Sequence, residues 1–170
     1  MTPIGHLSVS FITGKSINRF SLPALMIGGV LPDIDFVFIL FEWFNQVHRV
    51  ITHNIFFIIL ASFIGMIFAS RERRQTVGFS MFIGGALHLF IDSCMDNNPG
   101  NGVGIALLWP LSADFFSPFN LLPFTANSHG WSDPLKMLKT LVPNMMYEIP
   151  FYFIAAFHMI RKRFISRTAF

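Results

Sequence analysis

The sequence predicts an all-α fold, a polytopic helical membrane bundle with about four spanning or half-spanning helices and a long aromatic-rich interfacial loop. Hydrophobic residues make up 53% of the 170 residues, whereas charged residues make up only 12%, about half of the usual share in a soluble domain. The mean hydropathy is +0.57, and the 22 phenylalanines suit a lipid-facing exterior or an aromatic membrane interface. We therefore expect one membrane-embedded domain over residues 1–170.

The first 44 residues predict a short helical segment followed by an interrupted one. Residues 1–19 are mildly apolar and mixed, and suit a half-helix on the membrane or against the bundle. Residues 20–44 are long enough to cross a bilayer, but two carboxylates, Asp33 and Asp35, make a plain lipid-exposed helix implausible. Pro32 suits a first helical position and would place both aspartates in a first turn, where the helix dipole favours negative charge.

Two apolar helices are predicted next, over residues 54–70 and 76–95, after a polar interruption at 45–53. The first ends at the basic run 71–74, and the second contains Gly78, Gly84 and Gly85, small residues that allow close helix packing in a membrane.

The last 75 residues predict an irregular loop and one more helix. Residues 96–144 are rich in Gly, Pro and aromatic side chains, which suits an interfacial or re-entrant cap. Residues 145–160 form the predicted last helix, and the basic run that starts at Arg161 is expected to stop it.

Basic residues gather in the runs 71–74 and 161–167, each directly after an apolar stretch, as topology-setting membrane flanks do. If both runs face the cytoplasm, the polar segment 45–53, the end of helix 76–95 and the loop 96–144 lie on the non-cytoplasmic side. The basic residues are not spread along one face with interleaved aromatics, so no nucleic-acid footprint is visible.

The clearest candidate site begins with His88 and Asp92, which are four residues apart and so share one face of the predicted helix. That spacing suits two ligands of one metal ion, and it equally suits a buried hydrogen bond between helices. Asp33 and Asp35 would point the same way in an extended segment and would diverge in a helix. The alternative for them is a purely structural role at a helix start.

A third group is His48, Arg49, Thr52 and His53. Imidazole and carboxylate together are common ligands of catalytic zinc and iron, although both histidines could also be plain interfacial residues. The guanidinium group of Arg49 could bind a phosphate or carboxylate with two parallel hydrogen bonds, or it could be a cation at the membrane interface. Thr52 suits a supporting hydrogen bond or a helix cap.

These ionisable side chains come from apolar surroundings, where each would be unfavourable without a partner. Cys94 is the only cysteine, which excludes an intramolecular disulfide and a thiolate zinc cluster. A shared divalent cation is the simplest way to neutralise several carboxylates. A structural His–carboxylate network and a proton or ion pathway remain alternatives.

Four motifs in order resemble those of the YdjM family of bacterial inner-membrane-associated metal-dependent hydrolases. They are Gly29-Val-Leu-Pro-Asp-Ile-Asp35, His48-Arg49-Val-Ile-Thr-His53, His88-Leu-Phe-Ile-Asp92 and Trp109-Pro-Leu-Ser112, and the resemblance covers roughly residues 1–160. The family is distantly similar to zinc-dependent phospholipase C and related zinc nucleases, which implies phosphodiester hydrolysis. The chain departs from the family pattern at Asn54, where serine is usual, and at Phe36, where histidine often follows the aspartates.

The resemblance implies a membrane-bound hydrolase of phosphoric esters with a divalent metal, zinc for preference. The implied metal ligands are His6, Asp33, Asp35, His48, His53, His88 and Asp92, and the implied catalytic residues are Asp35, Arg49 and Glu148. His6 matches an early histidine of the family and Glu148 a late glutamate. The expected partners are membrane lipid and a lipid or phosphodiester substrate, in the bacterial inner membrane. The alternative is a non-catalytic regulatory or structural membrane protein.

Overall fold

A computed structural model describes the chain except residues 40, 42, 96–102, 120, 122–133 and 168–170. The described part is helical, apart from one isolated antiparallel bridge between Ile105 and Phe116. The predicted all-α class is therefore confirmed. Much of the predicted loop 96–144 lies outside the described residues.

The first helices form an antiparallel hairpin. Helix α1 spans Pro3–Ser16, and the Thr2 side chain caps it by accepting a hydrogen bond from the Gly5 amide. Helix α2 spans Leu22–Val30 and continues directly into the 3₁₀ helix η1, Leu31–Phe38. The predicted interruption is thus present as a change to 3₁₀ geometry at Pro32, and Asp33 lies in the first turn of η1.

A second antiparallel pair follows the short helix α3, Phe44–Val47. Helix α4 spans Ile55–Phe68 and helix α5 spans Arg74–Cys94, close to the predicted ranges. Asn54 caps α4, since its side-chain oxygen accepts from the Phe57 amide at 2.8 Å and its amide group donates to the Val50 and Ile51 carbonyls. Asparagine therefore performs the capping role that serine would perform at this position.

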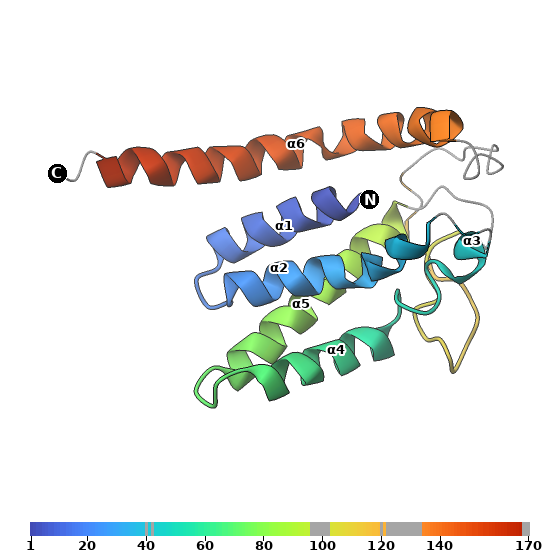
Figure 1. Ribbon diagram of the computed structural model, residues 1–170, viewed down its shortest axis with the longest axis horizontal. Coiled ribbons are helices and arrows are strands. Elements are labelled where there is room, and N and C mark those ends of the chain that lie inside the picture. Colours follow the sequence, from blue (N-terminus) through green and yellow to red (C-terminus); the bar gives the residue numbers. More distant parts are fainter. Residues whose placement is uncertain (40, 42, 96–102, 120, 122–133, 168–170) are drawn as a thin grey trace.

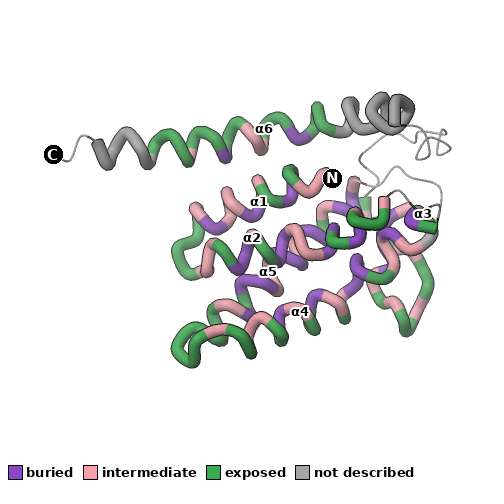
Figure 2. Tube along the Cα trace, viewed as in Figure 1, coloured by how far each residue is buried: buried purple, intermediate pink, exposed green. Residues whose placement is uncertain are grey.

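The helices lie in layers in the order α6, α1, α2 and then α5 with α4 (Figure 1). Helices α2 and α5 approach closely at two glycines: a Cβ atom on Gly84 would lie 2.2 Å from the Leu25 carbonyl oxygen, and one on Gly28 would lie 2.1 Å from the Met81 carbonyl oxygen. Only glycine permits this approach. Buried residues gather along α2 and α5 and in the segment that follows α3 (Figure 2).

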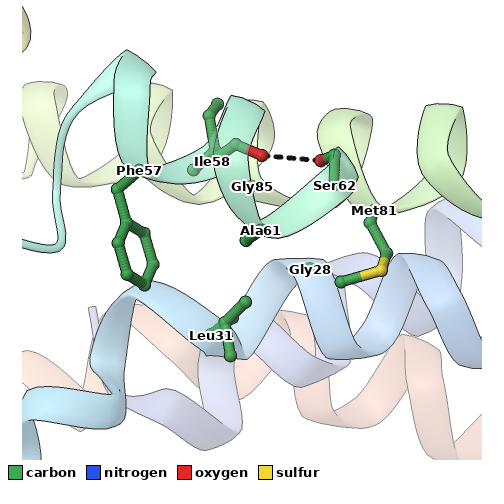
Figure 3. A pocket seen from close by; sticks show the side chains of 8 residues that line it. All are labelled: Gly28, Leu31, Phe57, Ile58, Ala61, Ser62, Met81 and Gly85. Carbon is green, nitrogen blue, oxygen red and sulfur yellow. Dashed lines mark hydrogen bonds between the residues drawn. The ribbon is translucent and has the colours of Figure 1, made fainter. Parts of the chain in front are cut away.

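Helix α4 closes the other side of α5 and faces the end of α2. Figure 3 shows Phe57 and Ala61 of α4 on the side that faces Leu31, with Met81 of α5 alongside. The Ser62 hydroxyl donates to the Ile58 carbonyl at 2.7 Å, so this polar group is satisfied within its own helix. The junction holds the start of η1, and therefore Asp33, against α4 and α5.

The last helix is longer than predicted. Helix α6 spans Pro134–Arg167, so the predicted loop boundary at residue 144 and the predicted helix end at residue 160 are both wrong. Pro134 opens the helix, a position where proline is favoured. The helix then continues through Pro143, a residue type that disfavours a helix interior, and through the basic run that begins at Arg161.

Among the described residues, α5 alone is long and apolar enough to cross a bilayer, and α4 is apolar but only 14 residues long. About four spanning or half-spanning helices were expected from the sequence. The structure shows one candidate span.

Candidate metal centre

Four predicted site residues converge from segments that are far apart in the sequence. Asp33 comes from η1, His53 from the turn before α4, and His88 and Asp92 from one face of α5. All four are buried, and their ligand atoms lie within 4.8 Å of one another. The HxxxD spacing therefore does place both side chains in one cluster, as the sequence predicts.

The distances among these atoms fit a tetrahedral metal ion. His53 Nε2 lies 3.1 Å from His88 Nε2, 3.5 Å from Asp33 Oδ1 and 3.5 Å from Asp92 Oδ2. His88 Nε2 lies 3.6 Å from Asp33 Oδ1 and 3.4 Å from Asp92 Oδ2. Ligands about 2.0–2.1 Å from a tetrahedral zinc ion lie about 3.3–3.4 Å from one another. These five distances are close to those of that coordination shell, and all four atoms lie within 4.8 Å of one another.

The hydrogen bonds fix the tautomer of both histidines. His88 Nδ1 lies 2.8 Å from the Gly29 carbonyl, which can only accept, so Nδ1 carries the proton. The Thr52 hydroxyl donates its one proton to Asp35 Oδ2, so it accepts from His53 Nδ1 at 3.0 Å. In the neutral imidazoles both Nε2 atoms therefore present lone pairs to the cluster.

The cluster therefore consists of hydrogen-bond acceptor atoms that face one another. Two imidazole lone pairs lie 3.1 Å apart beside the carboxylates of Asp33 and Asp92. Neither oxygen of Asp33 has a hydrogen-bond donor among the described residues, although both are buried. Such an arrangement is unfavourable unless a cation occupies its centre or one of the acceptors takes up a proton. Two histidines and two carboxylates are suitable ligands for zinc or a similar divalent metal.

His6 lies behind this cluster rather than within it. Its Nε2 donates to Asp92 Oδ1 at 3.0 Å, and the Met1 amino group lies 2.8 Å from the same oxygen. These contacts leave Asp92 Oδ2 directed at the two histidines. The His6 ring also stacks on His88, with 3.6 Å between ring centroids. The sequence predicts His6 as a metal ligand. In the structure His6 instead orients Asp92 and His88, two of the other predicted ligands.

Asp35 and His48 form a second group that shares His53 with the first. His48 Nδ1 donates to Asp35 Oδ2 at 2.9 Å, and Thr52 donates to the same oxygen at 3.1 Å. Burial lowers the pKa of His48 and outweighs the hydrogen bond to Asp35, which raises it. The lowered pKa favours the neutral imidazole, whose Nε2 carries a lone pair. Asp33 and Asp35 diverge, as expected for a helical segment.

Arg49 faces the same carboxylates from the turn before α4. Burial lowers the pKa of its guanidinium, while the charges of Asp92, Asp33 and Asp35 raise it. Its backbone has φ 67°, a left-handed conformation that is unusual for arginine. Its carbonyl accepts from the Ala106 amide at 3.0 Å. The strained backbone places a permanent positive charge beside the cluster.

Glu148 lies apart from both groups. Its carboxylate accepts from the Thr2 amide at 2.6 Å and from the Thr2 hydroxyl at 2.5 Å, and it also accepts from the Tyr152 hydroxyl. These contacts join α6 to the start of α1. The predicted role of Glu148 as a general base has no geometric support from these contacts.

One contribution to the site and one contact outside it have no sequence signal. The Gly29 carbonyl sets the His88 tautomer, and a backbone group leaves no trace in residue type. Tyr152 binds Glu148, and nothing in the spacing of α6 distinguishes it from other aromatic residues. Thr52, in contrast, stands out as the polar residue between Arg49 and His53.

One of three comparisons with known proteins identifies a family for this chain. Searches of curated proteins and of solved structures find no match. The model of one family, described as YdjM inner membrane protein, matches residues 1–163 and so includes every residue of both groups. The chain belongs to the YdjM inner membrane protein family.

Proposed function

We propose that this protein is a membrane-bound, metal-dependent hydrolase of phosphoric esters, with zinc as its metal. The observation that carries the proposal is the convergence of four buried acceptor atoms, from Asp33, His53, His88 and Asp92, at the spacing of a tetrahedral site. Four protein ligands fill a tetrahedral shell, so a divalent cation held there would have to become five-coordinate to polarise a phosphoryl oxygen or to lower the pKa of a water molecule to about 7.

The other residues of the site suit phosphodiester cleavage. In this reaction a water oxygen bonds to phosphorus and one proton of the water passes to a base, while the ester P–O bond breaks and the departing alkoxide oxygen takes up a proton. Asp35 is the base we favour, because its Oδ1 accepts no hydrogen bond from the described residues while its Oδ2 is held by His48 and Thr52. Arg49 would stabilise charge that develops on the phosphoryl oxygens.

A multi-pass arrangement is also part of the proposal. Helix α4 exposes large apolar side chains such as Ile59, Phe63 and Phe68, and α6 exposes Phe153 and Phe157. Exposed apolar faces of this extent suit contact with lipid. The turn between α4 and α5, which carries the basic run 71–74, and the C-terminal end of α6 lie at one end of the molecule, and η1 lies at the other (Figure 1). With the basic ends in the cytoplasm, the site faces the non-cytoplasmic leaflet.

The test uses the full chain purified in detergent, stripped with a chelator and titrated with Zn²⁺. Metal content is measured by mass spectrometry, and hydrolysis is measured with bis(4-nitrophenyl) phosphate and with phosphatidylglycerol vesicles. We expect about one tightly bound ion per chain. Asp92→Asn should lose it, while Asp114→Asn, which removes an exposed carboxylate that binds Ser112, should keep it.

The outcomes separate the alternatives. Zinc binding and hydrolysis that both disappear in Asp92→Asn support the enzyme. Zinc binding without hydrolysis of either substrate overturns the proposed phosphoesterase and favours a regulatory or structural protein with a metal-linked core. A folded wild-type chain that binds no divalent metal overturns the metal site itself.

A further inference from the structure

An apolar groove runs along the hairpin of α1 and α2 and ends at the candidate metal centre. It has a volume of about 710 Å³ and is lined by residues of α1, α2 and η1. Among the described residues that line it, Asp33 is the only one with a polar side chain. Asp33 is also one of the four residues of the metal cluster, so the groove and the cluster share a wall.

We propose that this groove holds one acyl chain of a membrane lipid and directs the lipid's phosphate group to the metal cluster. The inference rests on the proposed phosphoesterase function and names its substrate class, a glycerophospholipid. Such a molecule is apolar along its chain and polar at one end, which matches an apolar groove that ends beside Asp33, whose buried carboxylate belongs to the metal cluster.

The dimensions suit the same ligand. The lining residues extend along α2 and η1 from Leu22 to Ile34. With a rise of about 1.5 Å per residue in the α-helix and about 2.0 Å in the 3₁₀ helix, this is about 20 Å. One leaflet of a bilayer offers its chains about 15 Å of hydrocarbon, so a chain of ordinary length fits within the groove.

The walls of the groove are open to the surrounding lipid of an inner membrane protein. Ile4 on α1 and Ile27 on α2 are 61% and 54% exposed, and Ile34 on η1 is 53% exposed. These side chains can meet a lipid that enters sideways from the bilayer. A fully buried cavity would require a separate entry path.

The experiment places the full-length protein in vesicles of phosphatidylethanolamine and phosphatidylglycerol that contain a phospholipid with a photoreactive diazirine in its acyl chain. After illumination, mass spectrometry locates the labelled peptides. We expect label on the peptides that contain Ile4, Leu7 and Ile27. Ile27→Trp should lower this label roughly tenfold, as the exclusion of about two methylene groups from the groove would predict.

Ile59→Trp on α4 is the matched control, because Ile59 is 51% exposed and lies outside the groove. It should leave the groove label unchanged. Label spread evenly over α4, α6 and the groove, or groove label that Ile27→Trp does not reduce, would overturn the proposal. A dimer in detergent that Ile27→Trp converts to a monomer would assign the groove to a second copy and overturn it as well.

The labelling is independent of the chemistry. Asp92→Asn should abolish metal binding and keep the groove label, because Asp92 does not line the groove. Groove label in a wild-type protein that hydrolyses no phosphoester leaves the acyl-chain site intact and contradicts the proposed function alone. Hydrolysis of bis(4-nitrophenyl) phosphate without specific groove label contradicts the acyl-chain site alone.

Discussion

The hydroxyl of Thr52 controls which nitrogen of His53 carries the proton. It donates to Asp35 and accepts from His53 Nδ1, which leaves the Nε2 lone pair for the cluster. Partners of this kind hold a ligand in one tautomer and raise its basicity. Thr52→Val keeps the shape of the side chain and removes both hydrogen bonds. We expect it to weaken Zn²⁺ binding about 10–100-fold.

Competition with a fluorescent zinc chelator measures the affinity of each variant. Thr52→Ser retains the hydroxyl, and its Zn²⁺ affinity should be within a few-fold of wild type. This variant separates the effect of losing the methyl group from the effect of losing the hydrogen bonds. Equal affinity of Thr52→Val and wild type would show that His53 does not depend on this chain of hydrogen bonds.

Arg49 has an unfavourable backbone conformation and a side chain that we place at the phosphoryl group. Two substitutions distinguish the effect of the backbone from the effect of the side chain. Arg49→Gly and Arg49→Ala both remove the guanidinium, but only glycine adopts φ 67° freely. We expect Arg49→Gly to be more stable than Arg49→Ala by about 1–2 kcal/mol, the strain of a left-handed residue. Both should lose phosphodiester hydrolysis by a similar factor, roughly 10²–10³.

Thermal unfolding in detergent compares the two stabilities, and the bis(4-nitrophenyl) phosphate assay compares the rates. If Arg49→Ala is as stable as Arg49→Gly, the backbone at this position is not strained. If both variants hydrolyse at the wild-type rate, Arg49 has no role at the phosphoryl group.

At the scale of elements, the contact between α2 and α5 sets the geometry of the cluster. Helix α5 carries His88 and Asp92, while α2 leads into η1 with Asp33. Gly84 brings the two backbones together, since a Cβ there would lie 2.2 Å from the Leu25 carbonyl oxygen. Gly84→Ala must therefore push the helices apart. We expect a loss of roughly 1–3 kcal/mol in stability and weaker Zn²⁺ binding.

Gly65→Ala is the control, because its Cβ would meet the end of the flexible Met81 side chain. Met81 can move, and alanine is the better helix former by about 1 kcal/mol. This variant should stay close to wild type in melting temperature and in Zn²⁺ affinity. Gly84→Ala with unchanged zinc affinity would show that the separation of α2 and α5 does not determine the cluster.

Element positions could be predicted where apolar runs are long and have clear ends, as for α4 and α5. The boundaries of α6 could not, because Pro143 lies inside a helix whose packing and length outweigh the local preference against proline. The spacing of His88 and Asp92 predicted their shared face. The sequence left open whether Asp33 and Asp35 diverge, since this depends on the 3₁₀ geometry of η1.

For the molecule as a whole, the cluster is the place where the folding units meet. It joins η1, the turn before α4 and the end of α5. Without a cation or an added proton, the lone pairs and carboxylates there repel one another, which opposes the packing of these segments. A bound cation reverses the sign of that interaction, so metal binding and global stability must be linked.

This linkage predicts the response of the whole protein to metal. At a free Zn²⁺ concentration of about 100 times the dissociation constant, a single site that exists only in the folded state adds about 2.7 kcal/mol. For a chain of this length the melting temperature should rise by about 5–10 °C. Thermal unfolding of the chelator-treated protein in detergent, with and without Zn²⁺, measures this shift.

Asp92→Asn should remove the shift because Asp92 supplies one of the four converging atoms. Asp114→Asn should show the full shift because Asp114 lies outside both groups. An equal shift in Asp92→Asn and Asp114→Asn would mean that zinc binds elsewhere, and the buried acceptors would then need another source of compensation.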